Sequence, residues 1–147
     1  MSIPSFNDEG NLPPGIHWAT WEEFTQRFGT NDYRLRLIQG LKRALDCLKS
    51  AGCRTAYING SFVTSKELPR DFDGCWVTDG VNSALIDPVL LLFNDGRSAQ
   101  KAKYGGELFP TLAIDGVTGM IFLDFFQVDM ETGLAKGIIA LDLRRLS

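Results

Sequence analysis

The fold is decided by residues 58–76, which run Ile-Asn-Gly-Ser-Phe-Val-Thr-Ser-Lys-Glu-Leu-Pro-Arg-Asp-Phe-Asp-Gly-Cys-Trp. We predict strands over 55–59 and 71–77, because both runs are rich in apolar and β-favouring residues and a polar segment separates them. The first strand ends at the turn signal Gly60-Ser61. Because side chains alternate along a strand, Asp71 and Asp73 are expected to project from one face of the second strand.

Two helices are predicted upstream of this stretch. The first begins with a capping box at Thr20–Glu23, in which the Thr20 hydroxyl and the Glu23 carboxylate satisfy free backbone N–H groups at the start of the helix. The second begins at residues 30–32 and ends before Gly52. Its apolar residues recur at helical spacing, at Ile38, Leu41, Leu45 and Leu48.

Downstream, the sequence predicts a helix, a strand, a helix and a strand. The first helix would begin at Asp87-Pro88 and carry Val89, Leu90, Leu92 and Phe93. The next elements are expected at 107–110, at about 120–128 and at 136–143. This order predicts an α+β (two-layer α/β) domain over residues 1–147, with a small mixed sheet of about four to five strands and an extended arm at 1–15.

Composition narrows the class of protein. The 147 residues carry 15 basic and 18 acidic side chains, a net charge of −3, which argues against stable binding to DNA. No run of about 18 apolar residues is present, so no membrane helix is expected. The three cysteines form no CxxC pair, and residues 1–14 lack the apolar stretch of a secretory signal. These features predict a reduced, cytoplasmic protein.

The Gly60-Ser61 turn and the pair Asp71/Asp73 are the candidate chemistry. Two carboxylates on one face repel each other unless a cation lies between them, and Mg²⁺ prefers such oxygen ligands together with substrate phosphates. Glycine lets a phosphate approach the backbone closely, and a serine hydroxyl adds a hydrogen-bond donor. The alternative is a surface turn followed by a strand whose acidic face is solvated. The pattern alone leaves both interpretations open.

Residues 58–76 resemble the signature of the polymerase-β-type nucleotidyltransferase superfamily, a Gly-Ser turn followed by Asp-x-Asp on the next strand. More of the chain resembles a small bacterial family of uncharacterised function, DUF6932. That second resemblance includes the segments 12–17, 24–29, 51–53, 60–66 and 136–139.

The superfamily resemblance implies a site for Mg²⁺ or Mn²⁺ and a nucleoside triphosphate. Gly60 and Ser61 would hold the triphosphate, Asp71 and Asp73 would bind the metal, and Lys66 and Arg70 would contact phosphate oxygens. A third carboxylate is expected on a following strand, and Glu107 fits best because it begins the predicted strand at 107–110. The alternatives are Asp115, Asp124 and Asp129, or no third carboxylate.

Two functions follow as hypotheses. The first is a nucleotidyltransferase that moves a nucleoside monophosphate onto a hydroxyl of a protein, a tRNA or a small molecule, as in toxin–antitoxin or phage-defence pairs. The alternative is a degenerate, non-catalytic module that binds a partner protein or forms a homodimer, with His17, Trp18 and Trp21 as the docking surface. A basic-aromatic cluster at Lys101, Lys103 and Tyr104 is either a nucleotide contact or a solvated helix end. A serine hydrolase is disfavoured, because the only histidine is His17.

Overall fold

The computed structural model describes residues 3–93 and 95–146. In this part of the chain one mixed five-stranded sheet has the order β1-β5-β2-β3-β4. β2 is antiparallel to β3 and to β5, whereas the pairs β1–β5 and β3–β4 are parallel. The strands are β1 (Gly15–Ala19), β2 (Thr55–Asn59), β3 (Phe72–Trp76), β4 (Gly106–Pro110) and β5 (Gly137–Asp142). The predicted α+β class with a small mixed sheet is confirmed.

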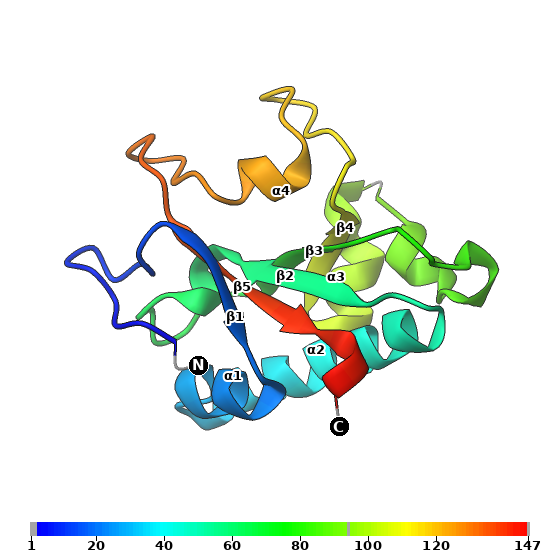
Figure 1. Ribbon diagram of the computed structural model, residues 1–147, viewed down its shortest axis with the longest axis horizontal. Coiled ribbons are helices and arrows are strands. Elements are labelled where there is room, and N and C mark those ends of the chain that lie inside the picture. The colour runs from blue at the N-terminus through cyan, green and yellow to red at the C-terminus, as the bar shows by residue number, and fades with distance from the viewer. Residues whose placement is uncertain (1–2, 94, 147) are drawn as a thin grey trace.

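The helices lie on both sides of this sheet. Figure 1 shows α1 (Trp21–Phe28) and α2 (Asp32–Ser50) along one face and α4 (Phe122–Phe125) on the opposite side. A third helix, α3 (Ser98–Tyr104), packs against α2 and β4. The main core lies between the sheet and α1, α2 and α3. Its fully buried side chains include Phe24, Leu41, Ile58, Phe72 and Leu108.

The two upstream helices form for the reasons that the sequence predicts. The Thr20 hydroxyl accepts a hydrogen bond from the Glu23 backbone N–H at 3.1 Å, and the Glu23 carboxylate accepts one from the Thr20 N–H at 2.9 Å. The Asn31 side chain caps α2 in the same way by accepting from the Arg34 N–H. Both capping predictions are therefore confirmed.

The N-terminal segment predicted as an extended arm packs against the rest of the domain. Residues 1 and 2 lie outside the described residues, but from residue 3 onward the arm is packed against the body. Leu12 is buried in the main core, and the Arg27 guanidinium donates hydrogen bonds to the carbonyls of Ile3 and Pro4. The arm then continues into β1, which pairs with β5 and which the sequence does not predict. β1 lacks an apolar alternation because it is an edge strand with half-exposed Ile16 and Trp18.

The predicted helices after β3 are wrong in place or in length. The segment after Asp87 is one 3₁₀ turn, Pro88–Leu91, and Leu92 is already extended. The chain then passes through Asp95, Gly96 and Arg97, all with φ between +54° and +63°, before α3 begins. This left-handed backbone separates the apolar run from the helix. The helix predicted over 120–128 is limited to the four residues of α4.

The second face of the sheet carries a smaller aromatic cluster. Cys75, Phe109 and Phe126 are buried there, with Phe122 and Phe125 of α4 packed against them. This cluster covers only part of the face. Among the described residues, no helix is both long enough and apolar enough to span a membrane.

Candidate functional site

The register of the sheet brings polar residues into one row. Asn59 on β2 is paired with Asp73 on β3, and Asp73 is paired with Glu107 on β4. Paired residues on neighbouring strands project from the same face, so their three side chains lie side by side. Asp71 lies two residues before Asp73, directly ahead of β3. Burial, together with the charge of Asp71, raises the pKa of the Asp73 carboxyl. We call Asp71, Asp73 and Glu107 the acidic cluster.

Gly60, at the end of this row, lies directly against Asp73. It has φ +76°, a conformation that favours glycine. A Cβ atom on Gly60 would lie 2.3 Å from Oδ2 of Asp73, which is closer than any real contact. Glycine is therefore required here both by the backbone conformation and by the approach of the carboxylate.

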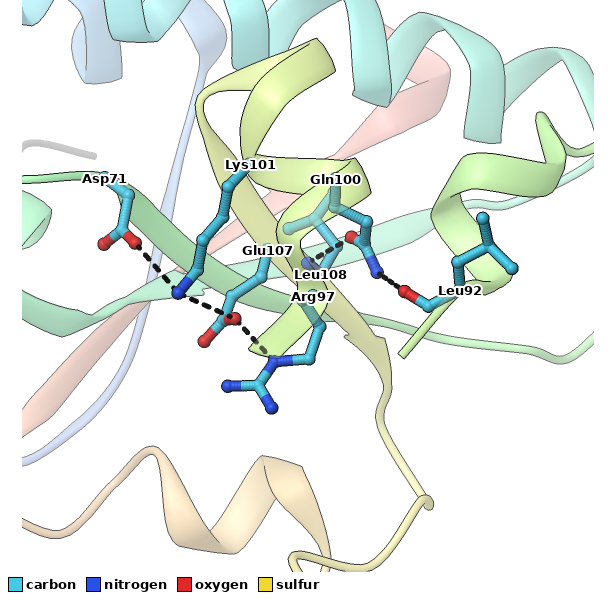
Figure 2. A network of polar contacts seen from close by, with 7 residues as sticks. All are labelled: Asp71, Leu92, Arg97, Gln100, Lys101, Glu107 and Leu108. Carbon is cyan, nitrogen blue, oxygen red and sulfur yellow. Dashed lines mark hydrogen bonds and ion pairs between the residues drawn. The ribbon is translucent and has the colours of Figure 1, made fainter. Parts of the chain in front are cut away.

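Two basic side chains neutralise the acidic cluster, and Figure 2 shows them on either side of Glu107. Arg97 donates from Nε to Oε2 of Glu107 at 2.8 Å. Nζ of Lys101, on α3, lies 3.7 Å from Oε2 of Glu107 and 3.9 Å from Oδ2 of Asp71. Lys101 thus bridges the two carboxylates, while the Glu107 side chain is only 12% exposed.

Repulsion and burial of its carboxyl groups make the acidic cluster destabilising for the folded state. Burial raises the pKa of Asp73 well above its usual value, and the charges of Asp71 and Glu107, with a hydrogen bond to Glu107, raise it further. Burial also raises the pKa of Asp71, although the Lys101 charge opposes this shift. Three carboxyl groups held this close make the folded state less stable than a neutral cluster would.

Gln100 fixes the position of the helix that carries Lys101. Its side-chain oxygen accepts a hydrogen bond from the Leu108 N–H on β4 at 2.9 Å, and its Nε2 donates to the Leu92 carbonyl at 3.3 Å (Figure 2). Gln100 is fully buried, so both bonds are shielded from water. The next residue along α3 is therefore held in place beside Glu107.

Asn59 is the unusual member of the row. The residue is 1% exposed, and its Oδ1 and Nδ2 atoms have no hydrogen-bond partner among the described residues. A buried amide without partners costs roughly 1–3 kcal/mol. Because Asn59 is paired with Asp73, its unused donor and acceptor groups lie beside the acidic cluster. Asn59 could not be recognised from the sequence, because its only signal there is its position directly before Gly60.

Arg34, on α2, fixes the loop that follows Gly60. This residue is 2% exposed, and its guanidinium donates hydrogen bonds to the carbonyls of Phe28, Phe62, Thr64 and Lys66. The guanidinium also lies 4.8 Å from the centre of the Phe62 ring. A buried cation bound to four carbonyls fixes the turn without help from a carboxylate.

Of the residues predicted to contact phosphate, Arg70 lies beside the acidic cluster, whereas Lys66 and Ser61 lie elsewhere. Arg70 directly precedes Asp71, and its charge lowers the pKa of the Asp71 carboxyl. Lys66 is exposed, and its described contacts are backbone ones in the loop. Ser61 lines a separate pocket of ≈ 420 Å³, whose charged lining residues are Glu9, Asp129, Glu131 and Lys136.

Among the candidates for the third carboxylate, the structure brings Glu107 to Asp73. Asp115 accepts hydrogen bonds from the N–H and the hydroxyl of Thr118 in a loop. Asp124 is exposed on α4, and Asp129 is bonded to Asn11 and to the Glu131 N–H in a turn.

The residues of the predicted basic-aromatic cluster, Lys101, Lys103 and Tyr104, bind two different carboxylate sites. Lys101 reaches the acidic cluster, whereas Lys103 and Tyr104 bind the carboxylate of Asp87, each at 2.5 Å. Arg97 is a further residue that sequence reasoning misses. It follows a loop that no pattern marks, and it reaches Glu107 because its own backbone is left-handed.

The donor set is suited to a hard cation, but it is not arranged around one. Over residues 3–93 and 95–146, no group of three or more His, Cys, Asp or Glu side chains forms a ready-made metal site. Figure 2 shows that the Lys101 ammonium group lies between the carboxylates of Asp71 and Glu107.

Comparisons with curated proteins and with solved structures give no match. The sequence model of one family, described as "Family of unknown function (DUF6932)", matches residues 4–142. This match covers nearly the whole chain and includes the Gly60-Ser61 turn, the acidic cluster and both residues that neutralise it. It confirms the narrower of the two resemblances, while the wider resemblance to nucleotidyltransferases stays a prediction. The chain belongs to the DUF6932 family.

Proposed function

We propose that the protein is a metal-dependent nucleotidyltransferase, which moves a nucleoside monophosphate from a nucleoside triphosphate to a hydroxyl acceptor. One observation carries the proposal: the sheet register gathers Asp71, Asp73 and Glu107 beside a buried Asn59 that has no described partner. A protein gains no stability from such a group of repelling carboxylates. Arrangements that cost stability are typical of functional sites.

The acidic cluster fits a divalent cation by its chemistry. Carboxylate oxygens are the ligands that Mg²⁺ and Mn²⁺ prefer, and the Asn59 amide oxygen is of the same hard type. Asp71, Asp73 and Glu107 would hold the metal. The bound metal would neutralise phosphate oxygens and stabilise the charge that develops on the leaving pyrophosphate.

The remaining residues of the site suit the binding of phosphate. Gly60 lets a phosphate approach the turn closely, and its neighbour Ser61 offers a hydroxyl group. Lys101 and Arg97 are cations within 4 Å of the cluster, and their ion pairs with it would be exchanged for contacts to phosphate oxygens. Arg70 and Lys66 flank the turn on the solvent side. The acidic residues around Ser61 disfavour a whole triphosphate in that pocket, so one phosphate would contact the turn and the others would extend toward Lys101.

The chain's own groups would orient the acceptor. Asp73 lies between Asn59 and Glu107 in the sheet register, so its carboxylate is placed to accept the proton that the attacking hydroxyl loses. Asn59, paired with Asp73, would donate a hydrogen bond that fixes the carboxylate or the bound hydroxyl. The acceptor belongs to a protein partner, a tRNA end or a small molecule.

The test is transfer of label from α-³²P-labelled nucleoside triphosphates in Mg²⁺ or Mn²⁺. Purified protein is incubated with the protein, tRNA and small-molecule fractions of a cell extract, beside the variant Asp73→Asn. The expected result is covalent label in one fraction, produced by the parent and absent with the variant. No label in any fraction, with all four nucleotides and both metals, would contradict the enzymatic proposal.

A specific observation favours one alternative, a non-catalytic module that binds a partner. Lys101 and Arg97 already neutralise Asp71 and Glu107, as expected of a degenerate site that holds no metal. In that case the edge strand β1, where Trp18 is 46% exposed, would provide the docking surface. Label transfer decides between the two functions, because a module without a metal site transfers nothing.

A further inference from the structure

A second pocket lies beyond the acidic cluster on the same face of the sheet. Its volume is ≈ 330 Å³, and its lining includes Phe93, Arg97, Phe109, Ile114, Asp115 and Phe122. We call it the aromatic pocket. It combines a mostly apolar wall with two charged groups, a composition typical of sites for small ligands.

Three aromatic rings are arranged in parallel at this pocket. Phe109 and Phe122 are stacked, with ring centres 4.0 Å apart and planes 7° apart. Phe93 is also nearly parallel to Phe109, at 5.7 Å and 18°. Phe109 is buried, but Phe93 is 39% exposed, although a phenylalanine at that position gains little by facing water. A planar ligand would extend this stack and cover the exposed surface of Phe93.

Arg97 connects the aromatic pocket to the acidic cluster. The same guanidinium that binds Glu107 lies 5.5 Å from the centre of the Phe109 ring and lines the pocket. Glu107 and Phe109 lie two residues apart on β4 and project from one face, which separates them by roughly 7 Å. A single ligand can therefore place phosphates at the cluster and a ring in the pocket.

We infer that the aromatic pocket binds the base of the nucleoside triphosphate. The inference rests on the proposed function, since it takes the acidic cluster as the phosphate end of the ligand. Stacking accepts every base, because every base has a flat aromatic face. The pocket provides little hydrogen-bond discrimination between adenine and guanine, because Asp115 is already engaged by Thr118.

Calorimetric titrations with three ligands separate the two ends of the site. Mg-ATP probes both ends, inorganic tripolyphosphate with Mg²⁺ probes the phosphate end, and adenosine probes the aromatic pocket. Each is titrated into the parent, into Phe93→Ala and into a matched control, Leu92→Ala. Leu92 is as exposed as its neighbour Phe93 but does not line the pocket, and both substitutions leave the core intact.

The expected result is that Phe93→Ala weakens the binding of ATP and of adenosine about 10-fold or more and leaves tripolyphosphate unaffected. Leu92→Ala changes none of the three affinities. Equal ATP affinity in the parent and in Phe93→Ala would overturn the base site, and the proposed function would stand if tripolyphosphate still binds. Failure of both phosphate ligands to bind would contradict the proposed function. If neither phosphate ligand binds, adenosine binding that depends on Phe93 would still support the aromatic pocket as a base site. Absence of adenosine binding would overturn the base site as well.

Discussion

At the scale of single residues, the approach of Asp73 to Gly60 leaves no room for a side chain at residue 60. Gly60 combines a left-handed backbone with a carboxylate at the place where a Cβ atom would lie. Any side chain at residue 60 must therefore strain the turn or displace Asp73. The position of the candidate catalytic carboxylate depends on the absence of a single carbon atom.

The variant Gly60→Ala is expected to be destabilised by about 1–3 kcal/mol, because alanine disfavours φ +76° and its Cβ would collide with Asp73. It should also lose metal–nucleotide binding. Urea denaturation measures the first effect and calorimetry the second. Gly133→Ala is the control for the collision with Asp73, since Gly133 has a similar left-handed backbone, at φ +72°, but a Cβ there meets nothing within 4 Å. Equal stability of Gly60→Ala and the parent would show that the turn tolerates a displaced Asp73.

Lys101 is the residue whose charge competes most directly with a metal. Its ammonium group lies between Asp71 and Glu107, so the variant Lys101→Met leaves the three carboxylates with less compensation. We expect Mn²⁺ to bind this variant about 10-fold more tightly than the parent, which corresponds to about 1.4 kcal/mol. Titration of Mn²⁺ followed by electron paramagnetic resonance measures the affinity without nucleotide.

The matched control for this substitution is Lys103→Met. Lys103 lies on the same helix, but its ammonium group binds Asp87, so its loss should leave Mn²⁺ affinity unchanged. Weaker Mn²⁺ binding in Lys101→Met than in the parent would mean that the lysine helps to form the site and does not compete for it.

At the scale of elements, Asp87 joins the segment before α3 to the end of that helix. Its carboxylate accepts hydrogen bonds from the Val89 N–H, from Lys103 and from the Tyr104 hydroxyl. The bonds from Lys103 and Tyr104, followed by that from Val89, lower the pKa of Asp87 to about 2, against an ordinary value of 3.8. The capping role predicted for Asp87 is confirmed, but the cap serves a 3₁₀ turn and also ties down α3.

This pKa has a consequence for stability at low pH. A lowered folded-state pKa stabilises the protein above the unfolded value of 3.8, and the contribution is lost as pH falls from about 4 to about 2. Asp87→Asn should therefore be less stable than the parent at pH 7, by about 1–2 kcal/mol after allowance for solvent screening. The difference should close near pH 2.

Urea denaturation at pH 7, 4, 3 and 2.5 follows the difference between the two proteins. Asp46→Asn removes an exposed pair with Lys42 on α2 and should cost far less at any of these pH values. A stability difference for Asp87→Asn that stays constant from pH 7 to 2.5 would contradict the assignment.

Elements with complete local signals could be predicted, and elements positioned by distant contacts could not. The capping box of α1, the apolar spacing of α2 and the paired patterns of β2 and β3 are all local. β1 forms because β5, over a hundred residues later, pairs with it. α3 lies where Gln100 bridges Leu92 and Leu108, and the left-handed residues before it carry no pattern. α4 has only four residues, fewer than predicted. Val128, which the sequence predicts to lie in the helix, instead forms an antiparallel bridge with Ala135.

The same distinction applies to the candidate site. Asp71 and Asp73 are two residues apart, so their shared face follows from the strand alone. Glu107 joins them because β4 lies parallel to β3 in one particular register, which the sequence suggests only through the position of a strand. Asn59 and Arg97 carry no recognisable signal, since one depends on burial and the other on backbone conformation.

At the scale of the whole molecule, the two faces of the sheet have different roles. One face packs against α1, α2 and α3 and holds the main core. The other face carries the acidic cluster, the aromatic pocket and a smaller hydrophobic cluster. Figure 1 shows α4 on this side of the sheet. The helices stabilise the sheet, and the stability that they provide offsets the cost of the carboxylates gathered on the opposite face.

The most direct test of the central claim is calorimetric titration of each Mg-nucleoside triphosphate into the parent and into Asp71→Asn/Asp73→Asn. We predict saturable binding to the parent that disappears when Mg²⁺ is removed and when both aspartates are replaced. The double variant should remain folded, because it relieves the repulsion within the acidic cluster. A folded parent that binds none of the four nucleotides, or binds them equally well without either aspartate, would contradict the account.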